Sequence, residues 1–342
     1  MTLSPLAAVV AAAALVASAI VVAPPAQAAP SGAVVDTTPA MKVLNPAKGE
    51  RQTVFEQDFT AGGAGEVRYV GSELVLNNPS TRIFIGVTVA CSGPSKFTDS
   101  MEAGRNVWPG DGTIVIPVGM VITTKAGGEH TCQTEVFMCD PGNCGSAQAV
   151  GTIPVVSKKT GQKSYSLLAI SSALPDWADD ALVPGPKDVL AASGTTFRSN
   201  EAFDVSEATG PIQVGAILSI TNCIEPAYPN VCGQASSTAI QGKAALGLRL
   251  IAKQIPTKRG VKCTVKKATK KGGARGYTIT WQQHHAAFAV EIPSFTLSTK
   301  AGCGTTVQVT VQVKAKSGNA IAIEGGTKKI PTSIAYVIPA QG

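Results

Sequence analysis

Eight cysteines are the residues of this chain whose type and spacing offer the clearest chemistry. The simplest framework pairs Cys91 with Cys132 and Cys263 with Cys303, which closes two loops of similar length. Spacing alone leaves other pairings open. We expect Cys139 to pair with Cys144 and Cys223 with Cys232, each closing a short surface loop. The proposed disulfide set is therefore Cys91, Cys132, Cys139, Cys144, Cys223, Cys232, Cys263 and Cys303.

A zinc cluster is the alternative use of these cysteines. Cys139 and Cys144, together with His130 and Cys132, superficially resemble a ligand set. Disulfides are favoured because the chain carries an export signal, described below, and exported proteins fold in an oxidising compartment. We therefore expect no metal, no cofactor and no reactive thiol.

Catalytic motifs do not stand out in the sequence. There is no nucleophile elbow, no His-Glu-x-x-His and no phosphate-binding glycine loop. His284 and His285 are adjacent in a strand-like context, where neighbouring side chains face opposite sides. Asp179-Asp180 could bind calcium weakly, but a solvated linker explains the pair as well. Whether the chain is an enzyme stays uncertain, and we expect that it is not.

The leader predicts export. Leu6 to Val22 is a small apolar run, and Ala26-Gln27-Ala28 matches a signal-peptidase site, so we expect cleavage after residue 28. A single membrane anchor is the alternative interpretation of this run. The C-terminus carries no hydrophobic tail, so we expect no membrane insertion of the mature chain. We predict a secreted, extracellular protein, with retention at the cell surface left open.

Charge divides the mature chain into two halves. Residues 29–180 carry 11 basic and 15 acidic residues, whereas residues 181–342 carry 18 basic and 7 acidic residues. The stretch from Ala227 to Val290 contains no Asp or Glu. Such a field attracts polyanions, and a solvated lysine-rich loop is the alternative. The proposed polyanion-binding residues are Lys258, Arg259, Lys262, Lys266, Lys267, Lys270, Lys271 and Arg275. Aromatic residues are not interleaved with them, so we expect no specific nucleic-acid binding.

Alternation with a period of two predicts an all-β fold. The clearest strand is Thr306 to Val313, where four valines share one face. Short helices are expected only near Pro175 to Ala181 and Lys187 to Ser193. Further strands are predicted at residues 73–76, 83–89, 112–118, 212–220, 277–281, 287–292 and 333–338.

The two halves resemble a diverged duplication. Val70-Gly71 and Ile116-Pro117 in the first half match Val214-Gly215 and Ile292-Pro293 in the second, in the same order. We predict two tandem Ig-like antiparallel β-sandwiches. The expected domains are a signal peptide (1–28), a flexible N-terminal segment (29–45), a first sandwich (46–174), a linker or crossover (175–205) and a basic second sandwich (206–342).

Three functions are compatible with these features. The first is a non-catalytic structural, matrix or cell-surface protein of a bacterium that self-assembles through its acidic and basic halves. The second is a binding module for an anionic wall or capsule polymer. The third is a secreted hydrolase with an unrecognised site. Expected partners are therefore a second copy of the chain or an anionic surface polymer.

Overall fold

The computed structural model describes residues 34–36, 43–44, 51–76, 82–94, 97–109, 114–139, 153–154, 165–170, 174–175, 187–190, 194–223, 242–270, 277–281, 285–325 and 333–340. Over these residues the protein is all-β, and its sheets are antiparallel. The part of the chain that the structure describes contains no helix with the length and apolar character needed to cross a membrane. The predicted signal peptide lies outside it.

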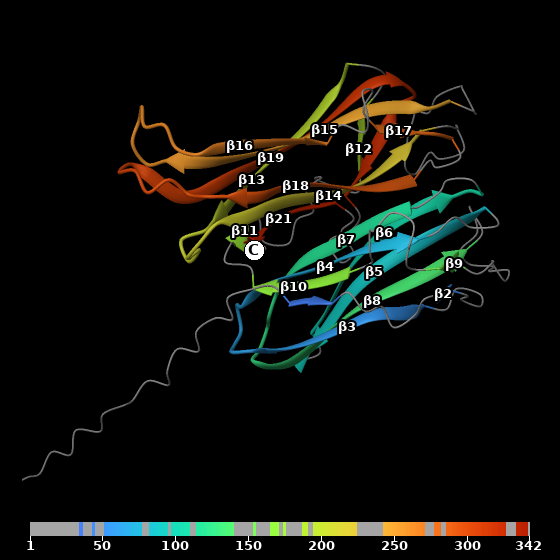
Figure 1. Cartoon of the computed structure of the whole chain (residues 1–342), viewed down its shortest axis with the longest axis horizontal. Coiled ribbons are helices and arrows are strands. Elements are labelled where there is room, and N and C mark those ends of the chain that lie inside the picture. Colours follow the sequence, from blue (N-terminus) through green and yellow to red (C-terminus); the bar gives the residue numbers. More distant parts are fainter. Residues whose placement is uncertain are drawn as a thin grey trace, which may run out of the picture. The chain divides into compact units, whose positions relative to one another are not determined.

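The first sandwich contains the blue-to-green strands of Figure 1. One sheet has the strand order β1-β10-β4-β7 and the other has the order β3-β8-β5-β6, with a small β2-β9 pair in addition. Its strands are β1 (Val34–Asp36), β2 (Val43–Leu44), β3 (Gln52–Ala61), β4 (Val67–Leu76), β5 (Ile83–Gly93), β6 (Phe97–Val107), β7 (Ile114–Thr123), β8 (Gly128–Cys139), β9 (Ile153–Pro154) and β10 (Tyr165–Ile170).

The second sandwich contains the remaining strands. One sheet has the order β12-β20-β14-β18, with β21 also paired to β14, and the other has the order β11-β13-β19-β15-β16, with β17 also paired to β15. Its strands are β11 (Leu174–Pro175), β12 (Lys187–Leu190), β13 (Thr196–Asp204), β14 (Ile212–Asn222), β15 (Ala244–Pro256), β16 (Val265–Lys270), β17 (Tyr277–Ile279), β18 (His285–Phe295), β19 (Cys303–Gly318), β20 (Ile321–Glu324) and β21 (Ile334–Pro339).

These strand orders are those of a jelly roll. A jelly roll has eight strands, lettered B to I along the chain, that form a B-I-D-G sheet and a C-H-E-F sheet. In the first sandwich β1-β10-β4-β7 and β3-β8-β5-β6 follow these two patterns. In the second, β12-β20-β14-β18 and β13-β19-β15-β16 do the same. The order departs from the Ig-like one that we expected, because alternation reports which face a residue occupies and not which strands are neighbours.

Several segments differ from the expectations drawn from sequence. The predicted linker, 175–205, contains β12 and β13, which pair with β20 and β19. The expected helix at Lys187 to Ser193 begins instead with strand β12, and the one near Pro175 to Ala181 lies mostly outside the described residues. The N-terminal segment, 29–45, contributes β1 and β2 to sheets. Proline and glycine residues flank these strands. They gave the segments the composition of loops, so the short apolar stretches within them were not recognised as strands.

Strand β19 shows why alternation works as a signal here. Val307, Val309, Val311 and Val313 are fully buried, whereas Gln308 and Gln312 are partly exposed on the opposite side of the strand. Side chains alternate across a strand, so one face joins the core and the other faces outward. The predicted strand is confirmed and extends further at both ends.

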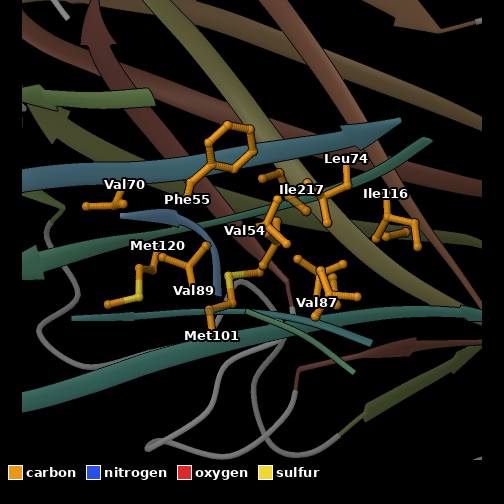
Figure 2. Close-up of a cluster of buried hydrophobic side chains, with 14 of the residues drawn as sticks. Val54, Phe55, Val70, Leu74, Val87, Val89, Met101, Ile116, Met120 and Ile217 are labelled. Carbon is orange, nitrogen blue, oxygen red and sulfur yellow. The ribbon is translucent and has the colours of Figure 1, made fainter. Parts of the chain in front are cut away.

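Strand β14 is buried on both faces, and for that reason it does not follow this pattern. Val214 and Leu218 belong to the apolar core of the second sandwich, whereas Ile217 belongs to the core of the first. Figure 2 shows Ile217 beside Leu74 and near Ile116. Strand β14 therefore contributes side chains to both cores, and residues 32–342 form one compact unit.

Both long disulfides predicted from spacing are present. Cys91 in β5 is bonded to Cys132 in β8, and Cys263 is bonded to Cys303 at the start of β19. Cys223 is also disulfide-bonded, but its predicted partner Cys232 lies outside the described residues. Cys144 does too, so the Cys139–Cys144 pair stays a prediction.

Candidate functional site: two sheet faces and a basic tip

The outward face of the β3-β8-β5-β6 sheet is acidic. In β8, His130, Cys132, Thr134 and Val136 are buried, so the alternate residues point outward. Cross-strand register places the outward residues of β3, β5 and β6 beside them. We call the acidic face the surface that carries Glu56, Asp58, Glu102, Glu129 and Glu135.

Arg51, which directly precedes β3, reaches two carboxylates of this acidic face. Its Nη2 donates to Glu102 Oε2 at 3.3 Å, and its Nη1 lies 3.9 Å from Glu135 Oε2. Its Nη1 also donates to the Thr88 hydroxyl, and the guanidinium lies 4.7 Å from the centre of the Phe137 ring. One guanidinium cannot neutralise all the carboxylates, so the face keeps a net negative charge.

The equivalent face of the second sandwich is basic. In the β13-β19-β15-β16 sheet, cross-strand pairing places Arg198, Gln312 and Arg249 side by side in one row. The basic face carries the exposed residues Arg198, Arg249, Lys253, Lys267 and Lys314. Asp204 is the acidic residue at its margin, and its carboxylate accepts hydrogen bonds from Ser206 and Thr305. The same sheet position therefore has opposite charge in the two sandwiches.

The structure separates the predicted polyanion-binding residues into two groups. Lys267 lies on the basic face, whereas Lys258, Arg259 and Lys262 lie on the turn between β15 and β16. Lys266 is exposed, and its Nζ donates to Ser294 O at 2.6 Å. Lys270 ends β16, and Lys271 and Arg275 lie outside the described residues. The segment was expected to be a single basic region, but its strand β16 divides it between two surfaces.

The turn between β18 and β19 lies against the turn between β15 and β16 and adds a further lysine to it. Thr257 N donates to Gly302 O at 2.8 Å, and Lys258 N donates to the same oxygen at 3.4 Å. The Cys263–Cys303 bridge joins the same two turns. Lys300 therefore belongs with the β15–β16 turn, and we call Lys258, Arg259, Lys262 and Lys300 the basic tip. Sequence reasoning missed Lys300 because it is distant along the chain, although the proposed Cys263–Cys303 pair was the signal that could have found it.

The described histidines serve packing and hydrogen bonding. His130 is buried, lies 4.9 Å from the Phe59 ring and has its Nδ1 3.0 Å from Gly128 O. Nδ1 of His285 lies 2.6 Å from Thr221 Oγ1 and 3.3 Å from Glu324 Oε1. A catalytic triad uses the two ring nitrogens for different partners, whereas here one nitrogen contacts both. His284 lies outside the described residues.

A cavity of about 300 Å³ is lined by residues of both sandwiches, among them Glu73, Arg105 and Tyr277. Burial raises the pKa of Tyr277 to about 12, so this phenol is protonated at neutral pH. Among the described residues that line the cavity there is no histidine or cysteine. Among the residues that the structure describes, no group of three potential metal ligands occurs. Charge is thus the chemistry that the described surface offers most clearly.

Comparisons with known proteins assign no family. No family model matches the chain, and no curated protein does. Among solved structures, the Gx strain of infectious bursal disease virus matches at 11% identity and a TM-score of 0.30, over 85% of this chain and 40% of that one. The tandem CBM22-1-CBM22-2 domain of Paenibacillus barcinonensis Xyn10C matches at 10% identity and a TM-score of 0.21, over 91% and 93%. The chain spans 40% of the viral chain's length. At these values the similarities assign no function.

Proposed function

We propose that the protein is a secreted, non-catalytic structural protein of the cell surface or extracellular matrix that assembles with copies of itself. The observation that carries this proposal is the opposite charge of two equivalent sheet faces, acidic in the first sandwich and basic in the second. In the assembly, the acidic face of one copy contacts the basic face of the next.

The size of the faces suits a specific contact. With strands about 4.8 Å apart and roughly 3.3 Å per residue, a four-stranded face measures roughly 20 by 30 Å. Two such faces in contact would bury about 1,200 Å², the lower end of the range for specific interfaces. Because the two faces differ, the contact is heterologous and continues from copy to copy unless a ring closes.

Export is part of this proposal. The predicted signal peptide, residues 1–28, would direct the chain out of the cytoplasm. The disulfides Cys91–Cys132 and Cys263–Cys303 suggest an oxidising environment.

The shared strand order of the two sandwiches supports a diverged duplication. After such a duplication, charge changes on the outward face of the same sheet in each copy would have produced two faces of complementary charge.

Light scattering of the oxidised mature protein tests self-association. We expect large particles at low salt and the monomer near 1 M salt, because the screening length falls from about 10 Å at 0.1 M to about 3 Å at 1 M. The variant Arg198→Glu/Arg249→Glu removes the net positive charge of the basic face and should stay monomeric at low salt.

The matched control places the same charge change on the basic tip, as Lys258→Glu/Lys300→Glu, and should still assemble. Assembly that persists at high salt, or that the basic-face variant retains, would contradict the proposal.

A further inference from the structure

A set of hydrogen bonds and a disulfide, which we call the brace, holds the backbone of the basic tip more firmly than an exposed turn requires. Gln254, in β15, is 2% exposed and lies directly behind it. Its Nε2 donates to Ser298 O at 3.1 Å and to Gly304 O at 2.7 Å. Its Oε1 accepts from Ser298 N at 2.8 Å and from Thr264 N at 3.4 Å. One buried amide therefore fixes three segments with its full set of hydrogen bonds.

Covalent and backbone links complete this brace. The Cys263–Cys303 disulfide joins the two turns at their base. Val261 N donates to Lys258 O, and Cys303 N donates to Lys300 O at 3.0 Å. Gly260 and Gly302 take φ values of 83° and 90°, which side chains rarely tolerate. The backbone positions of the four cations are thus set before any ligand arrives.

Within the described residues, no carboxylate forms an ion pair with a cation of the basic tip. The ion pairs of the described residues are those of Arg51, Arg68 and His285, which lie outside the tip. Asp204 is the carboxylate near the start of β19, and its oxygens are bonded to Ser206 and Thr305. The segment from Ala227 to Val290, which includes the β15–β16 turn, has no Asp or Glu. The tip therefore presents positive charge to the solvent.

We infer that the basic tip binds a linear anionic polymer that carries a phosphate or carboxylate group on each repeat unit. Arg259 can hold two oxygens of one group, and the lysines supply point charges for neighbouring groups. The cations lie on an exposed surface, so affinity comes from several weak contacts and counterion release. The two turns carry no aromatic residue for base stacking. This activity is separate from self-association, which uses the sheet faces.

Binding of long-chain polyphosphate to the oxidised mature protein is the direct test. The measurement is made where the protein is monomeric, using the Arg198→Glu/Arg249→Glu variant as the parent. We expect Lys258→Gln/Arg259→Gln/Lys262→Gln/Lys300→Gln to weaken binding by at least about 30-fold. It should also lower the slope of log K against log salt, by roughly 0.7 to 0.9 for each cation lost.

The matched control removes charge elsewhere. Lys267→Gln/Lys314→Gln, on the basic face, should weaken binding by less than half as much per charge as the tip variant. Equal losses per charge in the two variants would overturn the inference, and so would failure of polyphosphate to bind the parent. Because the parent cannot self-associate through its basic face, neither result bears on the proposed function.

The brace predicts a further effect that charge does not. Gln254→Met keeps every cation and the approximate side-chain volume, but it removes all four side-chain hydrogen bonds. In a variant whose circular dichroism matches the parent, we expect polyphosphate binding to weaken several-fold because the tip is less preorganised. Unchanged affinity in that folded variant would contradict preorganisation. If Gln254→Met does not fold, Cys263→Ser/Cys303→Ser is the second test of the same point.

Polygalacturonate and neutral dextran identify the chemistry of the polymer. Binding of both polyphosphate and polygalacturonate supports recognition of anionic repeats in general, and binding of polyphosphate alone supports phosphate. Binding of dextran with equal affinity would overturn the inference, because dextran carries no charge.

Discussion

At the scale of single residues, glycines beneath aromatic rings set how closely strands approach. A Cβ on Gly215 would collide with the buried ring of Tyr336, which stacks on Tyr69 with ring centres 4.2 Å apart. A Cβ on Gly86 would collide in the same way with the ring of Phe137. The Tyr336 hydroxyl donates to Glu291 at 2.6 Å, so this ring cannot move aside freely.

Gly215→Ala should therefore destabilise the protein by about 1–3 kcal/mol, the usual cost of overpacking a core. Urea unfolding measures the difference in the free energy of unfolding. Gly210→Ala is the matched control, because a Cβ added at Gly210 would meet nothing within 4 Å, and it should be neutral or slightly stabilising. Equal stabilities of the two variants would contradict the packing described for Tyr336.

At the scale of elements, the sequence was informative wherever one face of a strand is apolar. Strand β19 and the long disulfides could be predicted, because four alternating valines and matched cysteine spacing leave few other interpretations. Strand β16 could not, because an edge strand tolerates lysines on both faces. The acidic face was also missed, although Glu129, Thr131, Gln133 and Glu135 alternate with buried residues. Strand order is a tertiary property that alternation does not record.

The Cys263–Cys303 disulfide should contribute substantially to stability because it closes a loop with a sequence separation of 40 residues. Cys263→Ser/Cys303→Ser should lower the free energy of unfolding by about 3–4 kcal/mol, through the greater freedom of the unfolded chain. Urea unfolding of the oxidised protein and the variant gives this difference. A loss below about 1 kcal/mol would contradict this account, because it would show that the bridge restricts the unfolded chain much less than a loop of this length requires.

At the scale of the whole molecule, charge separation is the feature that links sequence to function. The sequence showed an acidic half and a basic half, and the structure places much of that charge on one equivalent sheet of each sandwich. Sequence alone could not show this concentration, because it depends on which strands are neighbours. The remaining cations gather at the basic tip, so self-association and polymer binding use different surfaces.

The most direct test of self-association mixes two variants that cannot assemble alone. Glu56→Lys/Asp58→Lys removes the net negative charge of the acidic face, and Arg198→Glu/Arg249→Glu removes the net positive charge of the basic face. Light scattering at low salt should show a monomer for each variant alone and a pair of chains for the equimolar mixture, because the unmodified basic face of one variant can meet the unmodified acidic face of the other. A mixture that stays monomeric while the unmodified protein assembles would contradict the account.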